Sequence, residues 1–144
     1  MIQKVINITK DIDSDDVVEL SWFDMQKPNL SAVSNSGVEF MIKVKFTHLH
    51  ENDILVCEDG HTMQVKRSDD EVYEIILDNS LDFARVAYEV GNRHQPVCIE
   101  ENKITVLNDI SLSDIIENCE KDENTIVSKI KKYFKPNGKA HHVH

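Results

Sequence analysis

The chain has 144 residues, and its 26 acidic side chains against 16 basic ones give a formal net charge of −10. This length allows one ordinary domain or two very small ones. No apolar run approaches the ~20 residues that span a bilayer, and the N-terminus lacks a signal-peptide core, so we expect a cytoplasmic protein with no membrane partner. The acid excess also argues against nucleic acid as a partner.

The three cysteines, Cys57, Cys98 and Cys119, lie far apart in apolar segments, and no CxxC motif occurs. An odd count without close spacing argues against a disulfide framework. Buried free thiols in a reducing compartment are the simplest interpretation.

The first half of the chain has short apolar or alternating segments separated by turn residues. These segments predict strands at residues 38–46, 54–57, 61–66 and 72–77. Asp59-Gly60 favours a tight hairpin between two of them. The acidic stretch from Asp11 to Glu19 is expected to be a solvated loop or strand edge.

Beyond Leu77 the apolar spacing changes to that of helices. Ser80 is predicted to cap a helix with apolar residues at i, i+3, i+4 and i+7, and Gly91 is predicted to end it in a left-handed conformation. Ser111 is predicted to cap a second helix. Strands are predicted around the helices, at residues 97–99, 104–107 and 125–134. From Val72 to Phe134 the order is β-α-β-β-α-β, the ferredoxin-like arrangement.

We therefore expect an α+β chain of two domains and a tail. The predicted parts are a small β-barrel or sandwich (1–75), a ferredoxin-like domain (76–136) and a flexible histidine tail (137–144). Domains this small bury little surface, so packing between them or dimerisation is expected to stabilise them.

Histidines are concentrated at the end of the chain. His141, His142 and His144 account for three of the seven histidines. Imidazole suits Ni, Cu, Zn and Fe, and close histidines on a mobile end can close around one ion. A disordered end and a purification tag are the alternatives, although a tag is usually an unbroken run.

A further histidine, His94, lies in the segment Gly91–Pro96 directly after the first predicted helix. Gly91 stops the helix and Pro96 stiffens the exit, so His94 is presented on a short connection. Taken alone, a loop histidine is more often a hydrogen-bonding residue than a ligand. Metal binding at His48 and His50, or at His61, is a minority interpretation.

Signatures of catalysis are missing from the sequence. The four glycines form no phosphate-binding loop, and neither GxSxG nor HExxH occurs. Since the carboxylates are scattered, we expect no enzyme.

Together, the Gly-Asn-Arg-His segment at 91–94, the apolar strand after Pro96 and the histidine tail resemble the UreE family of urease accessory proteins. The resemblance implies a two-domain homodimer, with a peptide-binding-like first domain and a ferredoxin-like second domain. It implies that His94 of two copies binds one Ni(II) at the dimer interface. His142 and His144, with His141 as the alternative, would complete the coordination.

The resemblance implies a nickel metallochaperone that delivers Ni(II) to urease. The implied partners are a second copy, the urease apoprotein and its accessory proteins, including the maturation GTPase. The same histidines are also expected to bind Cu(II) or Zn(II) in vitro, because Cu(II) binds nitrogen ligands more tightly than Ni(II) does. The alternative is a protein-binding adapter of a metalloenzyme maturation complex, in which metal binding is secondary.

Overall fold

The computed structural model describes residues 1–43 and 49–138. The chain forms two compact units, Met1–Ser68 and Asp69–His144. The boundary between the units lies after Ser68, whereas the predicted boundary lies after residue 75. The whole of β7 (Asp70–Leu77) belongs to the second unit, because it pairs along its length with strands of that unit. His48, the tail histidines and the second half of the strand predicted at 38–46 lie outside the described residues.

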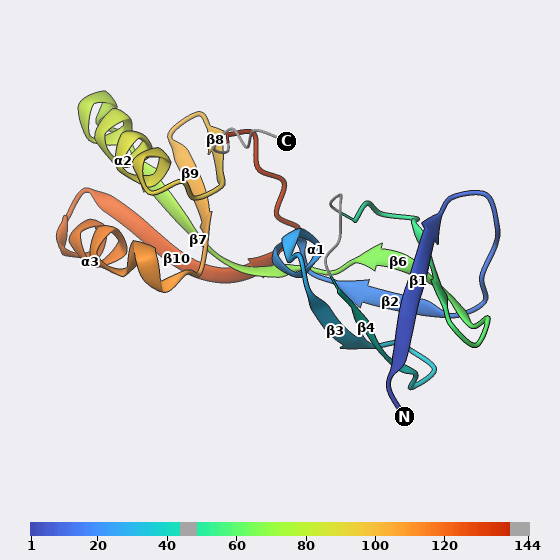
Figure 1. Ribbon diagram of the computed structural model, residues 1–144. Coiled ribbons are helices and arrows are strands. Elements are labelled where there is room, and N and C mark those ends of the chain that lie inside the picture. The colour runs from blue at the N-terminus through green and yellow to red at the C-terminus, as the bar shows by residue number, and fades with distance from the viewer. Residues whose placement is uncertain (44–48, 139–144) are drawn as a thin grey trace. The chain divides into compact units, whose positions relative to one another are not determined.

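The first unit is built on a six-stranded sheet with the order β2-β6-β5-β1-β4-β3 (Figure 1). Its elements are β1 (Gln3–Thr9), β2 (Val17–Leu20), α1 (Trp22–Gln26), β3 (Leu30–Val33), β4 (Glu39–Ile42), β5 (Ile54–Cys57) and β6 (Thr62–Arg67). The pairs β1–β4 and β2–β6 are parallel. Apolar side chains form one core, in which Phe40, Leu55 and Met63 are almost completely buried.

The predicted hairpin in this unit is confirmed. Strands β5 and β6 are antiparallel, and Gly60 in the turn has a φ of 91°, which glycine adopts without strain. Strand β4 is found within the segment 38–46. Strand β1 was not predicted, because only Val5 of its seven residues is buried and its sequence lacks the period of two.

The expectation that the acidic stretch is solvated is wrong at Asp16. Its side chain is only 8% exposed. It accepts hydrogen bonds from the N–H of Val17 (2.9 Å), from the N–H of Ser36 (3.1 Å) and from Ser36 Oγ (2.7 Å), and it lies 2.7 Å from His61 Nε2. Burial by itself raises the pKa of the Asp16 carboxyl, but the hydrogen bonds outweigh burial and hold that pKa well below its usual value. Asp16 therefore ties β2 to the β3–β4 turn and to the start of β6.

The second unit is a four-stranded sheet with the order β10-β7-β9-β8, and both of its longer helices pack on one side of it (Figure 1). The elements after β7 are α2 (Ser80–Asn92), β8 (Val97–Glu100), β9 (Lys103–Leu107), the 3-10 helix η1 (Ile110–Leu112), α3 (Ser113–Lys121) and β10 (Thr125–Lys132). The predicted order β-α-β-β-α-β is confirmed. In the described ranges, no helix has the length and apolar character needed to cross a bilayer.

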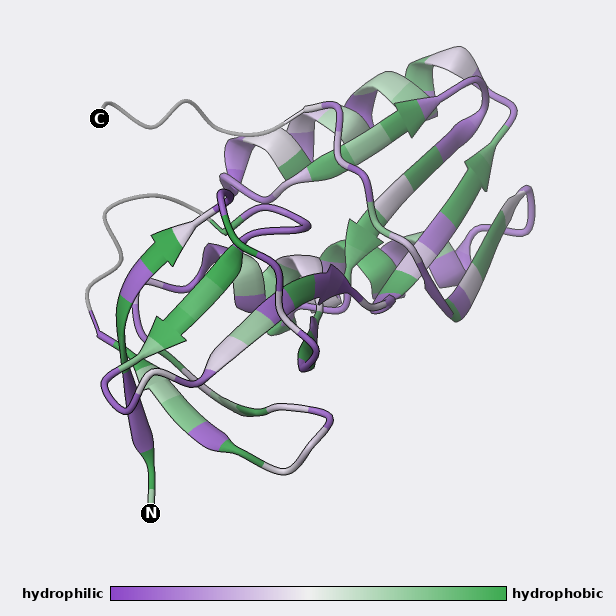
Figure 2. Ribbon diagram, turned by 90° about the vertical axis from the view of Figure 1, so that its right-hand side faces the viewer, coloured by the Kyte–Doolittle hydropathy of each residue, from purple (hydrophilic) through white to green (hydrophobic). Residues whose placement is uncertain are grey.

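The core of this unit lies between the sheet and the two helices. Ile75 and Ile104 of the sheet pack there with Val90 of α2 and Ile115 of α3. The helix ribbons carry both hydrophobic and hydrophilic bands (Figure 2), as expected for helices that bury one face.

Two predicted helix starts are wrong. Asn79, and not Ser80, caps α2, since its Oδ1 accepts hydrogen bonds from the N–H groups of Leu81 and Asp82, each at 3.0 Å. Asp109 caps η1 by accepting from the N–H of Ser111 at 2.9 Å. Asn and Asp cap helices as well as Ser does, so residue type alone does not decide between neighbours.

Candidate metal centre

The segment Gly91–Pro96 begins inside helix α2 rather than after it. Arg93 is the C-cap, and Gly91 is part of the helix, so the prediction that Gly91 ends it is wrong. The left-handed residue is His94, with a φ of 57°.

Two backbone hydrogen bonds close the helix around His94. The N–H of His94 donates to the carbonyl of Gly91 at 3.0 Å, and the N–H of Gln95 donates to the carbonyl of Val90 at 3.4 Å. This is the Schellman motif, whose left-handed position is usually glycine. The turn comes here because the residue before Pro96 avoids the α region, so the helix does not continue through Gln95.

The left-handed backbone is costly for His94. A side chain in this conformation costs about 1 kcal/mol relative to glycine, although histidine adopts it more often than most residues. Strained residues of this kind concentrate at functional sites. Asn52 and Asn102 are the other non-glycine residues with a positive φ in the described ranges, so His94 is the one of the three whose side chain is a common metal ligand.

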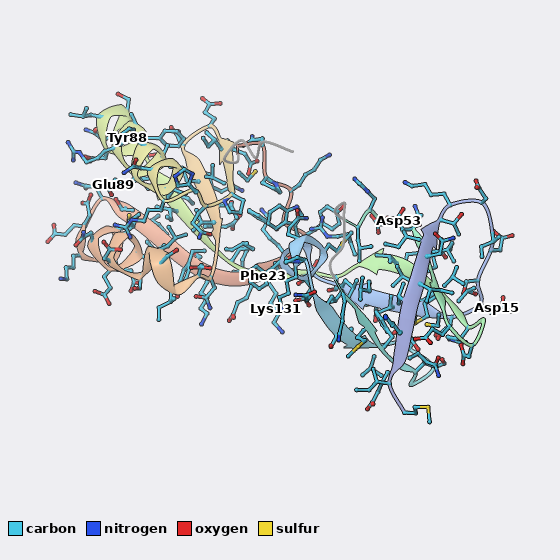
Figure 3. The ribbon with its side chains drawn as sticks, viewed as in Figure 1. Asp15, Phe23, Asp53, Tyr88, Glu89 and Lys131 are labelled. Carbon is cyan, nitrogen blue, oxygen red and sulfur yellow. The ribbon has the colours of Figure 1, made fainter. Side chains whose placement is uncertain are left out.

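The imidazole of His94 is the freest of the three described histidine rings. It is exposed, and within residues 1–43 and 49–138 it has no hydrogen-bond partner. By contrast, His61 Nε2 lies 2.7 Å from Asp16 Oδ2, and His50 Nδ1 lies 3.9 Å from Asp53 Oδ2 (Asp53 is labelled in Figure 3). A metal ligand must offer a free nitrogen lone pair, so His94 is the best-prepared ligand of the three.

Arg93 holds the helix end next to His94. Its guanidinium donates from both Nη atoms to the carboxylate of Asp114, with Nη2 and Oδ2 at 2.7 Å, and Nη1 also donates to the carbonyl of Ser111 at 2.5 Å. The Arg93 bonds lower the pKa of Asp114 to about 2, so this carboxylate stays charged at neutral pH. Because Asp114 lies in the first turn of α3, the pair joins the end of α2 to the start of α3.

The last described residue, Gly138, lies beside the edge strand β8. The N–H of Val97 donates to the carbonyl of Gly138 at 2.8 Å, and the N–H of Gly138 donates to the carbonyl of Val97 at 2.9 Å, in an antiparallel bridge. Strand β8 begins directly after Pro96. Because the bridge is antiparallel, the chain at Gly138 runs toward the start of β8, where His94 lies.

The three thiols are poorly prepared as metal ligands. All are free, and Cys57 and Cys119 are buried as expected, whereas Cys98 is half-buried. Burial raises the pKa of Cys119 to about 11 and raises the pKa values of Cys57 and Cys98 as well. The thiols are therefore protonated at neutral pH, and the protonated form is a poor ligand.

The described residues do not complete a metal centre by themselves. Across residues 1–43 and 49–138, no three His, Cys, Asp or Glu side chains come together in a way that could hold an ion. A centre at His94 therefore needs ligands from elsewhere. The predicted ligands His141, His142 and His144 lie outside the described residues.

Comparison with known proteins identifies the second unit directly. The family model described as "UreE urease accessory protein, C-terminal domain" matches residues 70–144. A urease accessory protein UreE of Aliarcobacter butzleri (strain RM4018) is 62% identical over 144 residues, which are 100% of this chain and 97% of that protein. The chain belongs to the UreE family.

More distant UreE proteins also match most of the chain. Those of Chelativorans sp. (strain BNC1) and Lysinibacillus sphaericus (strain C3-41) are 27% and 26% identical, over 90% and 86% of this chain and 80% and 84% of their own lengths. The resemblance to the UreE family that rested on Gly91–Pro96 and the tail is thus confirmed. These relatives are named as accessory proteins of urease, not as enzymes.

Two features around His94 in this UreE chain were not predicted. The first is the ion pair of Arg93 with Asp114, which joins residues 21 positions apart and has no local signature. Pro136-Asn137-Gly138 is a turn signal in the sequence, and its pairing with β8 has no local signature.

Proposed function

We propose that this UreE chain is a nickel metallochaperone, which binds Ni(II) and delivers it to urease while the urease active site is assembled. The observation that carries the proposal is the exposed, strained His94 with its free imidazole. We infer that His142 and His144, with His141 as the alternative, supply further ligands. The ferredoxin-like domains of two copies would face each other so that two His94 side chains share one ion.

Exposed apolar side chains near His94 support a homodimer. Tyr88 lies on α2 (Figure 3) and is 71% exposed. Ile110 is 90% exposed, and the next residue, Ser111, accepts a hydrogen bond from Arg93. Burying such side chains against a second copy is favourable. The further partners that we propose are the urease apoprotein and its accessory proteins, including the maturation GTPase, in the cytoplasm.

The chemistry of imidazole fits a carrier. Neutral nitrogen ligands bind Ni(II), and Cu(II) or Zn(II) also bind them in vitro, so selection would come from metal supply and from the acceptor. Ligands contributed by two copies and by the chain end can leave one at a time, which favours transfer. Imidazole must be deprotonated to bind, so affinity falls as the pH drops through the usual histidine range near ~6.5.

Calorimetric titration with Ni(II) tests the proposal. His94→Ala is expected to lower the affinity by about 100-fold or more, because even the loss of an outer-shell partner costs 10–100-fold. His50→Ala is the matched control, since His50 is also exposed, and it is expected to bind as the wild type does. Wild-type stoichiometry and affinity in His94→Ala would contradict the proposal. Urease activation at limiting nickel then tests delivery, and His94→Ala is expected to reduce it.

A further inference from the structure

The segment after β10 crosses the sheet of the second unit from one edge to the other. Strands β10 and β8 are the two edges, and the chain leaves β10 at Lys132. The six residues 133–138, here called the strap, connect Lys132 to the β8 edge. With Thr105 of β9, among others, the strap lines a cavity of about 420 Å³. Ile104 and Val106, on either side of Thr105, belong to the helix-side core, so the strap lies on the opposite face.

At the end of the strap, the side chain of Asn137 takes the place of a neighbouring strand. Its Oδ1 accepts from the N–H of Ile99 at 2.7 Å, and its Nδ2 donates to the carbonyl of Ile99 at 2.7 Å. A paired strand makes the same two bonds with its backbone. The N–H of Asn137 also donates to the carbonyl of Val97 at 3.0 Å.

Gly138 fits closely against the same strand. A Cβ atom at Gly138 would lie 3.0 Å from Val97 Cγ1, which is tighter than most contacts of that kind. The pair Asn137-Gly138 thus forms a clip, and its five hydrogen bonds are all made to Val97 and Ile99 of β8.

We propose that Asn137 is a positioning residue, which fastens the chain end to β8 and thereby aims the tail histidines at His94. The inference rests on the proposed function. His141 follows Gly138 by three residues, and three residues of chain span at most about 10 Å. Without the clip the nearest anchor is Phe134, which is 1% exposed, and His141 is then seven residues away.

The shorter tether raises the local concentration of the tail histidines around His94. Effective concentration falls roughly as the −3/2 power of tether length, so lengthening the tether from three to seven residues lowers it by about 3.5-fold. The clip acts only through the tail histidines, and it does not touch the ion itself. Its loss is therefore expected to have no effect in a chain that lacks these histidines.

The experiment is a double-mutant cycle on the full chain, read out by Ni(II) titration. The variants are Asn137→Ala, a chain ending at Gly138, and the combination of the two, with Asn124→Ala as the matched control on an exposed turn. Asn137→Ala is expected to weaken Ni(II) binding by about 3.5-fold in the full chain and to change nothing in the shortened chain. Gly138→Ala, which crowds Val97, is expected to act in the same direction, and amide exchange at Ile99 reports whether the clip has opened.

Three results would overturn the inference. The first is wild-type affinity in Asn137→Ala with faster amide exchange at Ile99. The second is an equal loss in the full and shortened chains, which would mean that Asn137 acts on the fold. The third is wild-type Ni(II) affinity in the chain that ends at Gly138, because the tail histidines would then contribute nothing that Asn137 could position. In the third case His94→Ala still decides whether the proposed nickel site exists.

Discussion

Each unit of the chain carries a histidine beside a turn, and the two are held in opposite ways. In the first unit, His61 Nε2 lies 2.7 Å from the buried carboxylate of Asp16, and its N–H donates to Asp59 Oδ1 at 2.9 Å. In the second unit, His94 is held by its backbone in a left-handed turn, while its ring has no partner among the described residues.

The difference separates a histidine that serves structure in one unit from a histidine whose ring is available for a ligand in the other. The ring of His61 is a member of a hydrogen-bond network, so changing it disturbs the fold. The backbone of His94 bears strain and its ring stays available, so under the proposed function a change of His94 is expected to disturb Ni(II) binding and to leave the fold intact. Residue type and spacing do not distinguish these two cases, whereas the hydrogen-bond partners do.

The largest expected effect is in the first unit. Asp16→Ala removes a carboxylate that is only 8% exposed and that pairs with Val17, Ser36 and His61, and each hydrogen bond to it contributes on the order of 1 kcal/mol. We expect the free energy of unfolding to fall by about 3 kcal/mol, measured by urea denaturation. Ni(II) binding by the folded protein should stay as in the wild type, and a joint loss of both properties would break the comparison between the units.

Acid unfolding gives the next effect. The pKa of Asp16 is lower in the folded chain than the unfolded value near ~3.9, so its contribution to stability is present above about pH 4 and is lost as the pH falls below it. Asp114, with a folded pKa of about 2, likewise contributes stability that is lost as the pH falls. Asp16→Asn should flatten the decline of the unfolding free energy between about pH 5 and 2. Asp114→Asn should flatten it less, because the side chain of Asp114 is 61% exposed and its ion pair is screened by solvent. A larger effect of Asp114→Asn would contradict this order.

The smallest effect concerns the strain at His94. His94→Gly removes the left-handed penalty and is expected to raise the free energy of unfolding by about 1 kcal/mol, while Ni(II) binding is lost. The matched change His61→Gly is expected to lower stability, because it removes a partner of Asp16. If the comparison holds, urea denaturation shows a higher free energy of unfolding for His94→Gly than for the wild type and a lower one for His61→Gly. A decrease for His94→Gly would show that the left-handed turn is not strained.

Local patterns were sufficient for the elements whose residues pack against their near neighbours. The β5–β6 hairpin, with Gly60 in its turn, followed from a run of apolar residues and a dipeptide, and α2 followed from the spacing of its apolar face. Strands β1 and β2 did not follow, because β1 buries Val5 alone of its seven residues and β2 has four residues, so neither shows a sustained period of two. Each also makes a parallel pair with a strand that is not its neighbour in sequence. Their partners are decided by the sheet and not by a turn between them.

The sequence by itself determined that His94 is special, because Gly91–Pro96 marks a helix end that carries a histidine, and it determined the family and the order of elements in the second unit. Only the tertiary structure decided that His94, and not Gly91, takes the left-handed position, and that Asn137 meets Ile99 on the edge of β8. The reason is physical. A helix end depends on the contacts that its last turn makes, and an edge pairing joins residues 38 positions apart, for which no local spacing exists.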